Sequence, residues 1–87
     1  MTGWMIYNIE DYNKNKKYFE MHKEIADKNG ITLELKFMEN FSYGVNSHSE
    51  YFILYDKQRV ELPKFVIGRM RNPLFTKQLE LMGIDVY

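Results

Sequence analysis

Two arginines, Arg69 and Arg71, are the side chains in this sequence that are best suited to bind an anion. They follow an apolar run at residues 65–67, which predicts a buried strand, and they precede Asn72 and Pro73, which favour the start of a helix. In an open parallel sheet, ligands bind outside the carboxyl ends of the strands. Residues two apart in an extended segment point the same way, and the N–H groups of a helix start add partial positive charge. The sequence therefore predicts an anion-binding site.

An ordinary structural role for the same arginines remains an alternative. One arginine could pair with a carboxylate such as Glu80 while the other is solvated, as surface arginines commonly are. The two hypotheses differ in whether a carboxylate of the chain itself neutralises a guanidinium.

Asn8 is a further candidate, because it follows the first expected strand and would lie beside the same edge of the sheet, next to Tyr7. Its amide could orient a ligand or cap the turn into the first helix. The predicted substrate-binding set is Arg69, Arg71, Asn72 and Asn8.

No residues in the sequence form a recognisable catalytic or metal-binding pattern. His22 falls on the apolar face of the first expected helix, where a lone histidine usually packs and forms a hydrogen bond, and His48 lies in a polar segment. The serines lack the strand-turn-helix context of a hydrolase nucleophile, and cysteine is absent. The five glycines are scattered and form no phosphate-binding loop. We therefore predict no catalytic, cofactor-binding or metal-ligating residue in this chain.

The length and charge of the chain restrict its class. Its 87 residues, with 45% hydrophobic content, are enough for one small domain. The 12 basic and 12 acidic residues give a formal net charge of zero, which disfavours nucleic acid and anionic membranes as partners. No window approaches the ~20 apolar residues that a membrane span needs. Because the cysteines of small secreted scaffolds are also missing, we expect a cytoplasmic protein.

The expected strands indicate a mostly parallel sheet. Short apolar runs at residues 3–8 and 65–67 are typical of parallel strands covered on both faces, and the first of them is predicted to be central. Residues 31–37 alternate between apolar and polar side chains, which indicates an edge strand. A fourth strand is expected at residues 84–87.

Two helices are expected to connect these strands. Asp11 is predicted to cap a helix whose apolar side chains recur at spacings of three and four until Ala26, with Gly30 after its end. Asn72 and Pro73 open the second helix, and Gly83 ends it.

The middle of the chain is expected to leave the sheet. Residues 39–50 are rich in Asn, Ser, Gly and His, which predicts a surface loop. Residues 51–55 and 60–62 flank a polar segment at 56–59 and predict a short β-hairpin. The fold class is therefore α/β, with a mostly parallel four-stranded sheet, two helices and a hairpin.

Three segments carry a resemblance to a known family: residues 1–8, 62–73 and 79–87. They are similar to the N-terminal, pre-ATP-grasp domain of ATP-dependent carboxylate-amine ligases, such as ribosomal-protein glutamate ligases and lysine-biosynthesis ligases. The resemblance implies a small Rossmann-like domain of two or three layers that occupies residues 1–87. In such ligases the basic turn faces the cleft and helps to hold the substrate; here that turn is Arg69-Met70-Arg71-Asn72.

The same resemblance implies a longer ligase. Its remaining ATP-grasp domains would be the partners of this one, would bind ATP and Mg²⁺, and would activate a carboxylate as an acyl phosphate for attack by an amine. The substrate held by this domain would be an anionic small molecule or peptide. The chain alone is expected to be non-catalytic, and its end inside a strand is what a domain cut from a longer protein would show.

A free-standing adaptor is the alternative function. In this interpretation the hairpin and the long polar loop bind a partner protein. Surplus aromatic side chains and an unpaired strand edge would also allow a homodimer.

Overall fold

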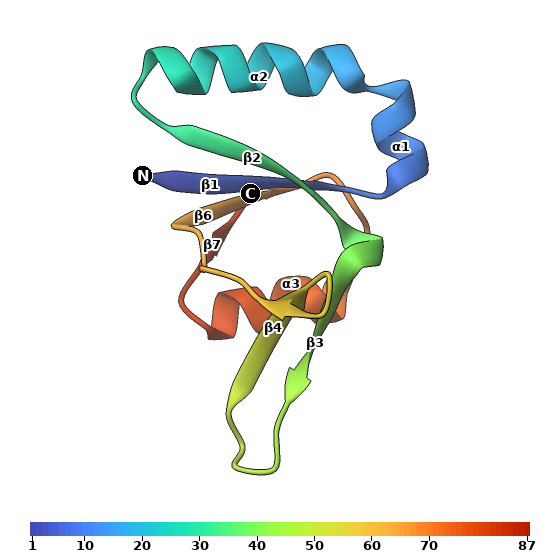
Figure 1. Ribbon diagram of the computed structural model, residues 1–87, viewed down its shortest axis with the longest axis vertical. Coiled ribbons are helices and arrows are strands. Elements are labelled where there is room, and N and C mark those ends of the chain that lie inside the picture. The colour runs from blue at the N-terminus through green and yellow to red at the C-terminus, as the bar shows by residue number, and fades with distance from the viewer.

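Four strands form one parallel sheet in the order β2-β1-β6-β7. A computed structural model describes residues 1–87 (Figure 1). The predicted parallel sheet is confirmed, with the first strand in the middle and the second at an edge. The strand bounds are β1 Thr2–Tyr7, β2 Thr32–Phe37, β6 Phe65–Gly68 and β7 Asp85–Val86.

β1 is buried on both faces, as its apolar sequence predicts. Trp4 and Ile6 contribute to one core, and Met5 and Tyr7 contribute to another on the opposite face. This division follows from the alternation of side chains along a strand. The exposed fractions of these four side chains are 2% or less.

Two consecutive helices, α1 (Ile9–Lys14) and α2 (Lys16–Lys28), pack on one face of the sheet. The sequence predicted one helix capped by Asp11, and this is wrong. The first helix begins at Ile9, three residues before the start that an Asp11 cap predicts, because both oxygens of the Glu39 carboxylate accept from the single Ile9 N–H, at 3.0 and 3.1 Å. Asp11 therefore lies inside α1.

The break between the helices lies at Asn15. Its side-chain amide donates to the Asp11 carbonyl oxygen at 2.8 Å, and its backbone amide donates to Tyr12. These local hydrogen bonds compete with continuation of the helix. The predicted end of the helix is confirmed, since Gly30 has a φ of 73°, a left-handed conformation that suits glycine.

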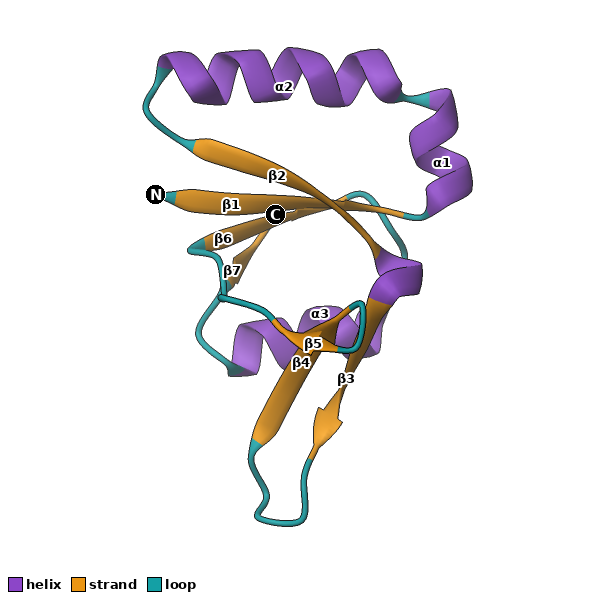
Figure 2. Cartoon of the chain, in the orientation of Figure 1, coloured by secondary structure: helices purple, strands orange, loops and turns teal.

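The other face of the parallel sheet is covered by α3 (Pro73–Leu81) and a second sheet (Figure 2). That sheet is antiparallel, in the order β3-β4-β5. Its strands, with the short 3₁₀ helix η1 that precedes them, are η1 Met38–Asn40, β3 Phe41–Val45, β4 Tyr51–Tyr55 and β5 Gln58–Arg59. The larger core lies between the two sheets and α3 and contains Trp4, Ile6, Phe41, Ile53, Val66, Phe75, Leu79 and Ile84.

The predicted surface loop at residues 39–50 is wrong for most of its length. Phe41 and Tyr43 point into the core beside α3, with ring centroids 4.9 and 4.7 Å from that of Phe75. Their alternation with small polar residues is a strand pattern that the overall polar composition obscured. The true turn is short and is organised by the Asn46 side chain, whose oxygen accepts hydrogen bonds from the His48 and Glu50 amides.

The predicted hairpin is confirmed, but its second arm is wrong. Asp56 and Lys57 both have positive φ, 52° and 63°, and so form a tight two-residue turn. This turn pairs Tyr55 with Gln58, which places the second arm at Gln58–Arg59 and leaves residues 60–62 outside the sheet.

None of the three α-helices combines the length and the apolar character that crossing a bilayer would require.

Gly3 lies where β1 passes beneath the ring of Phe65. A Cβ atom at this position would lie 2.2 Å from that ring. We therefore expect Gly3→Ala to lower the free energy of unfolding by about 1–3 kcal/mol, because the ring of Phe65 must move away from the new methyl group. Urea unfolding measures the change. Gly68→Ala is the matched control: its Cβ would meet nothing closer than 3.4 Å, and an effect equal to that of Gly3→Ala would contradict the packing explanation.

Candidate functional site

Arg69 lies at the carboxyl end of β6, beside the end of β1. Its backbone amide donates to the Ile6 carbonyl oxygen at 2.8 Å, and β6 runs parallel to β1. The side chain is exposed, and the guanidinium carbon lies 4.9 Å from the centroid of the Tyr18 ring on α2. A cation in this position is attracted by the face of the ring, which holds the guanidinium without neutralising its charge. The predicted place of Arg69 in the sheet is confirmed.

Tyr7 is the buried neighbour of this arginine. Its side chain is 2% exposed, and its hydroxyl has no hydrogen-bond partner. Burial raises the pKa of Tyr7 above its ordinary value of 10.0, and the Arg69 guanidinium opposes the shift only in part. Arg69 therefore lies near an unsatisfied polar atom but does not form a hydrogen bond of ordinary geometry with it.

Arg71 is exposed and separated from Arg69 by a bend at Met70. The segment is therefore not extended throughout, which removes the basis for expecting both guanidinium groups to point the same way. The alternative pairing with Glu80 is not observed, because the three ion pairs of the protein all join lysines to carboxylates within α1 or α2. Neither arginine is neutralised by a carboxylate of the chain.

Asn72 caps α3, as the sequence predicts. Its side-chain oxygen accepts a hydrogen bond from the Phe75 amide at 3.1 Å, and the Tyr43 hydroxyl donates to the same oxygen at 3.4 Å. Asn72 therefore links β3 to the start of α3. Asn8 occupies the N-cap position of α1, but its side chain makes no capping hydrogen bond. Their roles in substrate binding remain predictions.

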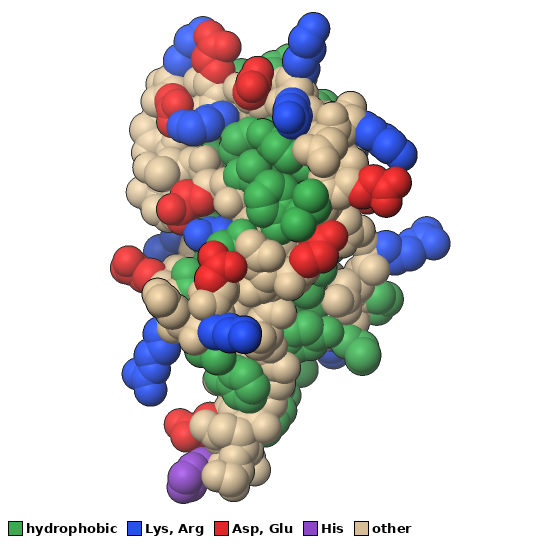
Figure 3. Space-filling model, turned by 45° about the vertical axis from the view of Figure 1, so that its right-hand side comes forward, with side chains coloured by type: hydrophobic (Ala, Val, Ile, Leu, Met, Phe, Trp, Pro, Cys, Tyr) green, Lys and Arg blue, Asp and Glu red, His purple; other side chains and the backbone are tan.

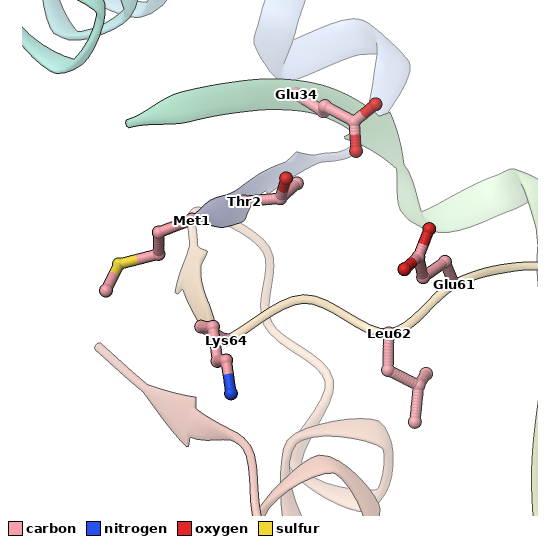
Figure 4. A pocket seen from close by; sticks show the side chains of 6 residues that line it. All are labelled: Met1, Thr2, Glu34, Glu61, Leu62 and Lys64. Carbon is pink, nitrogen blue, oxygen red and sulfur yellow. The ribbon is translucent and has the colours of Figure 1, made fainter. Parts of the chain in front are cut away.

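Neither Arg69 nor Arg71 lines any of the four cavities of the protein. One cavity, of about 290 Å³, contains the carboxylates of Glu34 and Glu61 (Figure 4). Thr2 and Lys64, at the amino ends of β1 and β6, also line it. The site at Arg69 is thus an exposed rim rather than an enclosed pocket.

The surface of the protein carries both signs of charge. Figure 3 shows basic and acidic side chains scattered around hydrophobic areas on one face of the molecule. The equal numbers of basic and acidic residues agree with this mixed pattern. The net charge of zero therefore supplies no broad field that would attract an anion to this surface.

The remaining polar candidates have local partners or lie apart. His22 Nδ1 is 3.0 Å from the Tyr18 carbonyl oxygen, which confirms the predicted hydrogen-bonded role. His48 is exposed at the turn between β3 and β4. No three histidine, aspartate or glutamate side chains gather where they could hold a metal ion.

No protein-family model matches the chain, and neither the curated proteins nor the solved structures contain a match.

Two residues that organise the site were missed from the sequence. Tyr18, which supports Arg69, was placed only as part of an apolar helix face, because a stacking partner 51 positions away has no local signal. Glu39, which binds the start of α1, lies 30 positions from Ile9. Long-range contacts of this kind require the topology to be known first.

Tyr7→Phe tests whether the buried hydroxyl has a partner. We expect the free energy of unfolding at pH 7 to fall by no more than ~0.5 kcal/mol, because no hydrogen bond is lost. Above pH 10 the unfolded chain releases the Tyr7 proton first, since the folded pKa is raised, so wild-type stability falls with rising pH. The unfolding free energy of Tyr7→Phe should therefore decrease less than that of the wild type above pH 10.

Urea unfolding at pH 7 and pH 10.5 measures both effects. The exposed Tyr51→Phe variant corrects for loss of an ordinary hydroxyl. A loss above ~1 kcal/mol specific to Tyr7→Phe at pH 7 would mean that the hydroxyl forms a hydrogen bond in solution.

Proposed function

We propose that this protein is a substrate-binding domain of the type found at the N-terminus of ATP-dependent carboxylate-amine ligases, with a Rossmann-like arrangement of its parallel sheet. Arg69 holds an anionic group of the substrate at the carboxyl edge of that sheet. The proposal rests first on the sequence resemblance in residues 1–8, 62–73 and 79–87.

The observation that carries the proposal is the state of Arg69. Its guanidinium is exposed, is supported by the Tyr18 ring and has no carboxylate partner in the chain. A guanidinium held in this way can donate two parallel hydrogen bonds to the oxygens of a carboxylate or phosphate. A neutralised arginine would have lost this capacity.

The topology is consistent with such a role. The chain moves from β1 to β2 on one side and from β6 to β7 on the other, so the connections diverge at β1 and β6. Ligands of open parallel sheets bind where the strand order reverses in this way. Arg69 lies at this point, because its amide is bonded to the end of β1.

The chemistry of ligation would belong to further domains. When bound there, ATP and Mg²⁺ would supply the phosphoryl group that activates the carboxylate. The residues of this chain only bind and orient the anionic group, and we assign no chemical step to them.

A second candidate function is a partner-binding adaptor. The observation that favours it is the hairpin of β3 and β4, which projects from the rest of the protein (Figure 1). Val45 and Tyr51 face each other near its end and are 55% and 43% exposed. An exposed apolar pair on a projecting hairpin suits contact with another protein.

Arg69→Ala is expected to abolish anion binding. A titration of the protein with L-glutamate and with a short glutamate-containing peptide, followed by NMR of the arginine side-chain N–H groups, should give saturable shifts at Arg69 with a Kd of ~1 mM. Arg71→Ala should weaken binding by less, because this side chain has no supporting ring. Arg59→Ala, an exposed arginine on β5, is the matched control and should change nothing.

The proposal fails if no saturable shift occurs, or if Arg59→Ala weakens binding as much as Arg69→Ala. A partner protein that is retained equally by wild type and by Arg69→Ala, and lost on Tyr51→Ser, would favour the adaptor.

A further inference from the structure

On the side of α2, one half of the parallel sheet is only partly covered: Phe65 and Ile67 of β6 pack against the edge of the core that contains Phe19 and stay partly exposed. Phe19 of α2 packs in a core with Met5, Tyr7 and Leu33, which belong to β1 and β2. In Figure 1, α2 lies beside β2, and β6 and β7 lie farther from it. We call the side chains of β6 and β7 on this side the bare half-face; they are Phe65, Ile67 and Asp85, together with Tyr87 at the end of β7.

The bare half-face is hollow and largely apolar. A cavity of about 590 Å³ is lined by Phe65, Ile67 and Tyr87, and an adjoining cavity of about 220 Å³ shares the first two of these residues. Tyr87 is 75% exposed. Parallel sheets normally have both faces covered, so this surface is incomplete in the isolated chain.

α2 contributes one exposed apolar side chain to the same hollow. His22 and Ile25 line the smaller cavity together with Phe65 and Ile67. The side chain of Ile25 is 54% exposed. This part of α2 therefore borders the hollow without being covered by the chain itself.

Two opposite charges lie at one end of the bare half-face. Lys64 precedes β6, and Asp85 begins β7 beside Phe65. Both line the larger cavity, and neither takes part in an ion pair within the chain. The two charges thus sit on adjacent strands at the same rim.

We propose that the bare half-face is the contact surface of a homodimer, in which it packs against the bare half-face of a second copy. A two-fold axis that runs parallel to the strands, between β6 and β7, places each β6 opposite the β7 of the other copy. Ile67 then meets Tyr87 of the partner subunit. Asp85 of the partner subunit then lies opposite Phe65 and one residue from Lys64, and the symmetry repeats this neighbouring pair of opposite charges.

The height of α2 fits this arrangement. Two sheets that pack face to face lie about 10 Å apart, which is close to the diameter of a helix. The partner sheet therefore fits beside α2, with its β7 against His22 and Ile25. Both the bare half-face and the adjoining side of α2 become buried.

A second copy suits this surface better than edge pairing does. β7 has only two residues, which is too short to extend the sheet across a stable interface. The charge order across β6 and β7 is complementary to itself under the two-fold rotation. A face-to-face dimer satisfies the apolar hollow and both charges at once.

Sedimentation equilibrium across a dilution series tests the proposal. Asp85→Lys and Lys64→Glu should each raise the dimer Kd about tenfold, because each sets like charges together at two symmetric positions. The double variant, Lys64→Glu with Asp85→Lys, should restore the wild-type Kd within about threefold, since it reverses both partners of each pair. Such a rescue is specific to a contact between copies.

Ile25→Lys provides an independent test of the contact made by α2, and should raise the dimer Kd at least tenfold. Leu81→Lys is its matched control, because Leu81 is 55% exposed on α3 at the other face of the sheet. Circular dichroism melting of the monomer at high dilution verifies that each variant is folded.

Three results would overturn the proposal: a wild-type protein that stays monomeric at millimolar concentration, a dimer that Ile25→Lys leaves intact, or a dimer that the double charge reversal does not restore. A monomer whose bare half-face binds an added amphipathic helical peptide would identify a helix as the occupant and would also overturn it.

Discussion

The burial of β1 between two cores is the constraint on which the rest of this structure depends. Trp4 and Ile6 meet α3 and the antiparallel sheet on one side, and Met5 and Tyr7 meet α2 on the other. β2 and β6 pair with β1 directly, and β7 pairs with β6. A strand that is buried on both faces leaves no polar surface of its own, so the residues suited to binding must lie where its neighbours end. This is where Arg69 and the Asn8 position occur.

The rim at Arg69 owes its character to the same burial. Tyr7 ends β1 inside a core, and its hydroxyl is buried without a hydrogen-bond partner. Arg69, which follows β6, is exposed to solvent. The Tyr18 ring lies under the guanidinium and fixes it above the boundary between these environments. An anion at this place would contact a charge on one side and an apolar surface on the other, where electrostatic attraction is less screened than in bulk water.

Local sequence signals predicted the parallel sheet, the cap of α3 by Asn72 and the ends of two helices at Gly30 and Gly83. Each depends on residues within a few positions of one another. The same reasoning placed Arg69 correctly at a strand end but did not find Tyr18. The same reasoning failed where contacts are distant in sequence. The start of α1 depends on a hydrogen bond to Glu39. Phe41 and Tyr43 pack against Phe75, and they form a strand although the composition of this segment is that of a loop.

The pairing of β1 with β6 also has a consequence for synthesis of the chain. β1 can pair with β2 once Phe37 has left the ribosome, but its second neighbour, β6, is available only after Gly68 has emerged. Until then the indole of Trp4 has no complete apolar surroundings, although the hairpin of β3 and β4 can already form from neighbouring residues. The parallel sheet and the larger core are therefore completed only after β6 and α3 have been synthesised.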